Sequence, residues 1–215
     1  MSLDATHIRF ALDHKEHLGA KDISEYLSGT VYPDSRYVSG IKREQTHSAV
    51  LEKKLQHSSD DFERGWFIHL LCDKVFNIAR TQKYLRVFDG VSKESNIIEW
   101  WHRSSALKLV QDLHNVRFVD TEMFSTWLVS KKNPCNEPAN SIEIHQKSIA
   151  DMYANVSYTQ ITPENYRYLF AVRNIDELSI KTIIDYSQEF LKDTYIAGSQ
   201  EELYAHAIKL AQEYL

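Results

Sequence analysis

Residues that interrupt helices are scarce in this sequence, and this scarcity constrains the fold more than any other feature. The 215 residues include only 6 glycines and 4 prolines. Inside a helix, glycine costs about 1 kcal/mol and proline about 3 kcal/mol relative to alanine, so most of this chain is free to form helix. The sequence therefore predicts an all-α protein with little sheet.

Apolar residues recur at helical spacing in a series of segments that we expect to be helices. Residues 58–61 offer N-caps for the most apolar of them, Phe62–Ala79, and Ser199 and Glu202 have the spacing of a capping box for the last helix. Gly29–Arg36 reads as a turn, and Val156–Ile161 is a segment that could form a strand. The other predicted helices are Thr6–Leu18, Lys21–Ser28, Ile41–His57, Ser95–His114, Thr121–Lys131, Ile142–Ala154, Ile175–Leu191 and one that begins at Thr162-Pro163-Glu164.

The length and the apolar content predict one domain. A chain of 215 residues of which 43% are hydrophobic has material for one sizeable core, and no linker, repeat or low-complexity stretch divides it. We expect a single-domain helical bundle over residues 1–215, with a metal-binding half at about 1–80 and a helical remainder at 81–215.

The charge pattern excludes several classes of partner. A net charge of −5 argues against a broad nucleic-acid surface and against binding to an anionic membrane.

No apolar run approaches the ~18 residues of a transmembrane segment. The first ten residues lack a secretory pattern, and Cys72 and Cys135 lack C-x-x-C spacing. We therefore predict a cytoplasmic protein.

The apolar segment Phe62–Ala79 contains a histidine and an aspartate four residues apart. This spacing places His69 and Asp73 on one helix face, one turn after Gly65. A carboxylate among so many apolar neighbours needs a cation or another strong partner. Taken alone, such a pair more often forms a structural ion pair than a metal site.

Three further groups in the first third of the chain are able to bind a metal. They are His7 in the first predicted helix, Asp34 in a Tyr-Pro-Asp turn and His47 in a later helix. Nitrogen and carboxylate ligands from several elements are the set that zinc takes. His14 shares a helix face with His7 and is a reserve ligand, whereas His145 has no partner at ligand spacing and is expected at the surface.

Four short motifs contain these residues in order. They are Thr6-His7, Gly29-Thr30-Val31-Tyr32-Pro33-Asp34-Ser35, Arg43-x-x-Thr46-His47 and Gly65-Trp66-Phe67-x-His69-Leu70-Leu71-x-Asp73. Their order resembles the signature of the zinc-dependent phospholipase C family over roughly residues 6–77. That family is similar in fold to the zinc-dependent single-strand nucleases, all-helical proteins that hydrolyse phosphate esters with a cluster of zinc ions.

The resemblance implies a role for each metal-binding residue. Asp34, His47, His69 and Asp73 would form a first zinc site, and Asp73 would bridge to a second ion held by His7. The family also supplies a His-x-x-x-Glu helix for another zinc, and this pattern does not occur after Asp73. We therefore expect one or two zinc ions rather than three.

The resemblance also implies an activity, the metal-dependent hydrolysis of a phosphoester, as in a phosphodiesterase. A metal-activated water would attack phosphorus, with Asp34 as the catalytic residue that orients or deprotonates it. Arg36 and Arg43 would bind the phosphoryl oxygens of the substrate. A small phosphoester or nucleotide fits better than a bilayer lipid, because the sequence shows no amphipathic membrane-binding stretch.

Two other functions remain open at this point. The first is a non-catalytic, metal-stabilised helical scaffold or interaction protein, which the missing His-x-x-x-Glu pattern favours. The second is an HD-type phosphohydrolase, which also uses His and Asp ligands on helices. The chain contains no adjacent His-Asp dipeptide, so this hypothesis ranks last.

Overall fold

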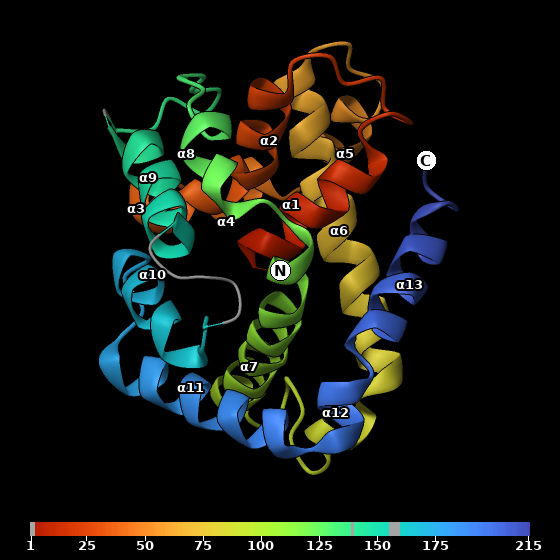
Figure 1. Ribbon diagram of the computed structural model, residues 1–215, viewed down its shortest axis with the longest axis vertical. Coiled ribbons are helices and arrows are strands. Elements are labelled where there is room, and N and C mark those ends of the chain that lie inside the picture. Colours follow the sequence, from red (N-terminus) through yellow and green to blue (C-terminus); the bar gives the residue numbers. More distant parts are fainter. Residues whose placement is uncertain (1–2, 139, 155–159) are drawn as a thin grey trace.

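The computed structural model describes residues 3–138, 140–154 and 160–215, and these residues form helices and turns without any strand (Figure 1). This confirms the all-α prediction. Most of the predicted strand Val156–Ile161 lies outside the described residues. The α-helices are α1 (Asp4–His14), α2 (Ile23–Val31), α3 (Arg36–Ser39), α4 (Arg43–Thr46), α5 (Ala49–Leu55), α6 (Asp61–Lys83), α7 (Ile97–Asn115), α8 (Phe124–Trp127), α9 (Ser141–Ala154), α10 (Tyr166–Val172), α11 (Glu177–Lys192), α12 (Thr194–Gly198) and α13 (Gln200–Ala211). Short 3₁₀ turns join some of them: η1 (Tyr32–Ser35), η2 (Leu85–Phe88), η3 (Val116–Phe118), η4 (Thr121–Met123) and η5 (Pro163–Asn165).

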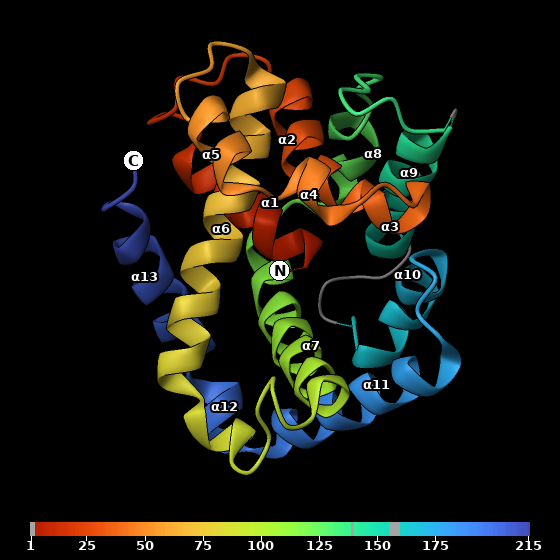
Figure 2. The same cartoon turned by 180° about the vertical axis from the view of Figure 1, so that it is seen from behind.

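The two longest helices, α6 and α7, run through the middle of the molecule (Figure 1 and Figure 2). Helix α13 packs along α6, and α11 packs along α7. The first helix, α1, contacts α2, α6 and α7 and so ties the amino-terminal part of the chain to the centre. Buried apolar residues from α1 through α13 form one continuous core.

Helix α6 follows the sequence prediction closely. Asp60 is its N-cap, and the carboxylate of Asp60 accepts a hydrogen bond from the backbone N–H of Glu63. Buried residues cover most of the helix circumference, as the apolar run predicts, and the helix continues past Ala79 to Lys83. Among the described residues, neither α6 nor any other helix is both long enough and apolar enough to cross a membrane.

Two glycines allow α2 and α6 to approach each other closely. A Cβ atom at Gly65 would lie 1.8 Å from the carbonyl oxygen of Tyr26, and one at Gly29 would lie 1.9 Å from that of Phe62. Only glycine fits at such a crossing, since any side chain would push the backbones apart. The element that approaches Gly65 closely is α2, and this crossing sets the position of α6, which carries His69 and Asp73, relative to α2.

The predicted helix Ile41–His57 is wrong as a single element. It consists of α4 and α5, and His47 between them has a non-helical backbone with φ −136° and ψ 46°. The side chain of Ser48 caps α5 by accepting a hydrogen bond from the N–H of Leu51, which competes with continuation of the preceding helix. The break turns His47 towards α6. Helix α2 likewise extends to Val31, so the predicted turn begins only at η1.

Two further predictions are wrong in part. The predicted helix Thr121–Lys131 is reduced to η4 and α8, which ends at Trp127. The predicted capping box of α13 does not form, because the Ser199 hydroxyl donates to the carbonyl oxygen of Tyr195 at 2.6 Å instead of capping α13. Sequence spacing alone cannot reveal such a competing acceptor.

Candidate metal centre and the adjoining cavity

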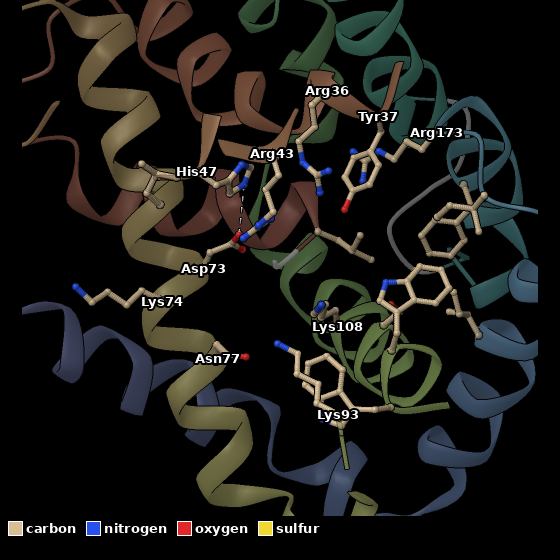
Figure 3. Close-up of a pocket in the computed structure, with 18 of the residues that line it drawn as sticks. Arg36, Tyr37, Arg43, His47, Asp73, Lys74, Asn77, Lys93, Lys108 and Arg173 are labelled. Atoms are coloured by element: carbon tan, nitrogen blue, oxygen red, sulfur yellow. Dashed lines mark ion pairs between the residues drawn. The ribbon is translucent and has the colours of Figure 1, made fainter. Parts of the chain in front are cut away.

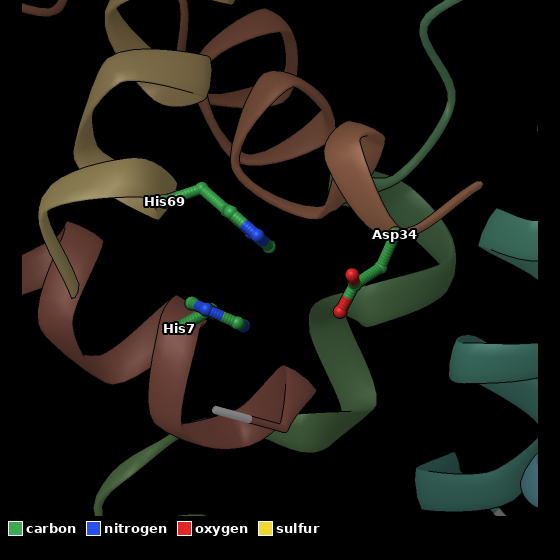
Figure 4. Close-up of side chains that lie close together, drawn as sticks. All are labelled: His7, Asp34 and His69. Atoms are coloured by element: carbon green, nitrogen blue, oxygen red, sulfur yellow. The ribbon is translucent and has the colours of Figure 1, made fainter. Parts of the chain in front are cut away.

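The structure brings all five predicted metal-binding residues into one buried cluster. His7 comes from α1, Asp34 from η1, His47 from the break after α4, and His69 and Asp73 from α6. Two sets of three have ligand atoms within 4.8 Å of one another and are able to hold a metal ion: His7 with Asp34 and His69, and His47 with His69 and Asp73. Figure 4 shows the first set, with the three side chains directed towards a common space.

The distances in the second set fit a single ion. The Nε2 atoms of His47 and His69 are 3.3 Å apart, and Oδ2 of Asp73 lies 3.7 Å and 3.8 Å from them. Zinc bonds to nitrogen and oxygen are about 2.0–2.2 Å long, so two atoms on the same ion are separated by up to about 4.4 Å. Asp34 Oδ1, 4.0 Å from Nε2 of His47, lies within the same limit.

The two oxygens of Asp73 face different partners. Oδ2 faces His47 and His69, whereas Oδ1 lies 3.2 Å from Nε2 of His7. The His7 ring stacks on the His69 ring with centroids 3.9 Å apart. A carboxylate between two groups of imidazoles has the arrangement that a bridging ligand requires, which is the role predicted for Asp73.

Hydrogen bonds fix which nitrogen of two histidines faces the cluster. Nδ1 of His69 donates to the carbonyl oxygen of Thr30 at 2.7 Å. Nδ1 of His47 is 2.7 Å from the hydroxyl oxygen of Thr46, and that hydroxyl donates to a backbone carbonyl in α4. The two Nε2 atoms therefore each carry a lone pair, and they face each other. The lone pairs repel each other, and a cation between them would remove this repulsion.

Asp34 is the clearest sign that the cluster suits a cation. Its side chain is 1% exposed, and neither carboxylate oxygen accepts a hydrogen bond from any described residue. Burial alone raises the pKa of this carboxyl group, but His69, Arg173 and His47 together hold it below its ordinary value. A buried, ionised carboxylate without hydrogen bonds is costly, and a metal ion removes that cost.

The two histidines are in the protonation state that metals bind. Burial lowers the pKa of His47 to about 4 and holds the pKa of His69 well below its ordinary value. Both rings are therefore neutral near pH 7, with Nε2 available for coordination. The residues of the cluster fit a zinc-like ion in charge, donor type and spacing.

The remaining histidines considered in the sequence do not join the cluster. His14 is buried, but its Nδ1 bonds to the carbonyl oxygen of Phe10 at 2.7 Å. The expectation that His145 lies at the surface is wrong, because its Nε2 donates to the carbonyl oxygen of Val31 in the core. Burial lowers the pKa of His145 to about 4, so it is a neutral structural residue.

A cavity of about 540 Å³ adjoins the cluster, and His47 and Asp73 form part of its wall (Figure 3). Arg36 and Arg43, the predicted substrate-binding residues, line the same cavity. The guanidinium group of Arg36 lies 3.8 Å from the centroid of the Tyr37 ring, which holds it in place. The volume is within the range of pockets for small organic molecules.

Part of the cavity wall consists of residues to which the sequence assigned no functional role. Lys93, Trp100, Trp101 and Lys108 line it from α7 and from the turn before that helix. The Trp100-Trp101 pair is visible in the sequence, but aromatic residues at helical spacing are more often core residues. The lysines carry no spacing signal that links them to the cluster, because their place in the cavity depends on how α7 packs against α1 and α11.

Comparisons of the chain with protein-family models, with curated proteins and with solved structures found no match.

Proposed function

We propose that this protein is a zinc-dependent hydrolase of small phosphoesters, similar in site chemistry to the zinc-dependent phospholipase C family. His7, Asp34, His47, His69 and Asp73 would hold one or two ions. A bound zinc ion would supply a positive charge for the phosphoryl oxygens and a water whose pKa falls to about 7. The parts of the reaction that depend on the protein are the ligand set, a base and a binding site for the phosphoryl group.

One observation carries this proposal. His47 and Asp73 belong both to the metal cluster and to the wall of the cavity, so a ligand in the cavity reaches the side of the cluster that they form. Their side chains are only 3% and 10% exposed, which limits access to this one face. A catalytic metal needs such an open side, whereas a purely structural metal does not.

The two arginines provide a phosphate-binding surface beside that opening. Arg36 and Arg43 form no ion pair with any residue that the structure describes, so their guanidinium groups are available. A guanidinium group binds two phosphate oxygens at once and stays charged at all working pH values. Neither oxygen of Asp34 has a hydrogen-bond partner among the described residues, so this carboxylate is able to accept a hydrogen bond from a water at the cluster and orient it.

The alternative function is a metal-stabilised helical scaffold. The set formed by His7, Asp34 and His69 favours this function. These three residues are each at most 1% exposed and lie on three separate elements. An ion held there would link α1, η1 and α6 without contact with a substrate. The two functions differ in whether metal-loaded protein turns over a phosphoester.

The test combines metal analysis with hydrolysis of a chromogenic phosphodiester and a chromogenic phosphomonoester. We expect one or two zinc ions per chain, and turnover that chelation abolishes and zinc restores. Asp73→Asn should lose metal and activity together, whereas Arg43→Met should keep its metal and raise KM. His57→Ala is the control, because His57 is exposed and lies outside the cluster.

The outcomes separate the hypotheses. Full metal content without turnover of either ester would favour the scaffold. Absence of metal after reconstitution, or metal content unchanged in Asp73→Asn, would mean that the cluster is not a metal site. Equal KM values for Arg43→Met and the unmodified protein would remove this arginine from the proposed binding site.

A further inference from the structure

The cavity wall is strongly positive although the chain as a whole is acidic. The net charge of the protein is −5, yet six basic residues and only two acidic ones line this cavity. Two of the basic residues are neutralised, since Lys74 pairs with Glu52 at 3.1 Å and Arg173 pairs with Asp4 at 2.7 Å. Those that form no ion pair with any described residue are Arg36, Arg43, Lys93 and Lys108.

These four cations form two groups at different places in the cavity. Arg36 and Arg43 lie on the side of the metal cluster, whereas Lys93 and Lys108 project from the α7 side (Figure 3). Asn77, one turn after Asp73 on α6, also lines the cavity. Four residues of helix span about 6 Å along the axis, so the cavity extends well past the cluster. A single phosphate at the cluster would leave the lysines without an anionic partner.

Lys108 is the member of the lysine pair that most needs an anion. It is half-buried in the central helix α7. Burial lowers its pKa to about 8, and the nearby charge of Arg80 contributes. Asp73 and Asp34 partly offset this effect, and Arg43 adds to it. An anion beside the amino group would stabilise the charged form, which burial and the charge of Arg80 disfavour.

Apolar side chains lie in the same cavity between these polar groups. Trp100, Trp101 and Phe170 are part of its wall, and the Lys93 ammonium lies 4.9 Å from the centroid of the Trp100 ring. Such a wall suits the hydrocarbon or aromatic part of an organic molecule. A simple inorganic anion would leave this surface exposed to water.

We propose that the substrate is an organic phosphate with a second phosphate group, remote from the ester that is cleaved, and that Lys93 and Lys108 bind this second group. The inference rests on the proposed function, because it extends the same site. Two ammonium groups match the double charge of a phosphate, and the aromatic wall lies beside them in the same cavity. The substrate class is therefore an organic bisphosphate rather than a simple phosphodiester with an uncharged remainder.

The test uses two probes that differ by one phosphate, phenyl phosphate and para-phenylene bisphosphate. Their binding is measured by calorimetry at pH 7 with the full chain, once after chelation and once with zinc. We expect the bisphosphate to bind at least about tenfold more tightly than the monophosphate, which corresponds to about 1.4 kcal/mol. Lys108→Met and Lys93→Met should each remove most of this preference and leave the affinity for phenyl phosphate unchanged.

A matched control excludes a general charge effect. Lys181→Met removes an exposed lysine that pairs with Asp185 on α11, away from the cavity, and should keep the full preference. If the unmodified protein binds both probes equally, or if both cavity variants retain the preference, the proposal is overturned. The chelated protein separates this result from the hydrolase proposal, because the lysines act there without metal and without turnover.

Discussion

Replacing Gly65 with alanine tests how the α2–α6 crossing supports the metal cluster. Gly65 lies one turn before His69 on α6, and the Nδ1 atom of His69 donates a hydrogen bond to the carbonyl oxygen of Thr30 on α2. The added methyl group would meet the backbone of α2, which cannot rotate away as a side chain can. Gly65→Ala should therefore separate the two helices and move His69 away from its partner.

The magnitude follows from the local geometry. The new Cβ would lie 1.8 Å from the carbonyl oxygen of Tyr26, whereas ordinary van der Waals contact begins at 3.4 Å. Overpacking of this kind costs about 3 kcal/mol at the upper end of its range, which applies because the obstruction is backbone. Loss of the His69 hydrogen bond adds about 1 kcal/mol, and the better helix propensity of alanine returns about 1 kcal/mol. The expected net destabilisation is about 3 kcal/mol.

Urea denaturation and thermal melting followed by circular dichroism measure this change. For a protein of this length the melting temperature should fall by about 6–12 °C, and bound zinc should decrease although every ligand is present. Gly198→Ala is the matched control, because a Cβ at Gly198 meets nothing within 4 Å. If Gly65→Ala is as stable as Gly198→Ala and binds as much zinc, the reasoning about the crossing is refuted.

Three further predictions concern ion pairs and metal. Asp4→Asn leaves the buried Arg173 charge unpaired and should destabilise the fold by about 3–5 kcal/mol in urea denaturation, whereas Asp4→Leu combined with Arg173→Met should recover most of this loss. A hydrogen bond from Arg9 lowers the pKa of Glu201 to about 2. The ionised Glu201 side chain therefore stabilises the fold above pH 4.5, and this stabilisation is lost as the pH falls towards 2. Because the Glu201 side chain is 54% exposed, Glu201→Gln should lower the free energy of unfolding by only about 1 kcal/mol at pH 7. A loss of stability in this variant that does not shrink between pH 5 and pH 3 would contradict the prediction. Zinc added at about 100 times its Kd to protein from which metal has been removed should raise the free energy of unfolding by about 2.7 kcal/mol. An equal gain in His69→Ala would show that His69 is not a zinc ligand.

The members of the candidate metal cluster could be predicted from two kinds of signal, local sequence context for some and the order of the motifs for the others. His69 and Asp73 are polar residues on one face of an apolar helix, and Asp34 follows a proline that ends the preceding helix. His7 and His47 were added by the order of the motifs, and the structure brings all five together. The metal, its number and the reaction remain predictions, because a ligand set is compatible with both a catalytic and a structural ion.

The cavity could not be predicted in the same way. Its second group of cations, Lys93 and Lys108, is separated from Asp73 by a helix end and a turn, and no periodicity relates them. The break at His47 was also missed, because a serine cap and a helix continuation are both compatible with the same apolar spacing. In each case the deciding interaction is made with a residue distant in sequence or with the backbone.

Scarce glycine and proline residues, together with helical periodicity, determined from the sequence alone that the regular secondary structure of the described residues is helical, since these effects act within a few residues along the chain. The sequence also determined which polar residues had to find a partner in the core. Only the tertiary structure decided that residues of α6 and α7 line one cavity, that Lys93 and Lys108 line it together with Arg36 and Arg43, and that His47 and Asp73 form part of its wall. The physical reason is that these relations depend on how close two helices approach, and at the α2–α6 crossing that distance is set by glycines whose effect appears only when both backbones are in place.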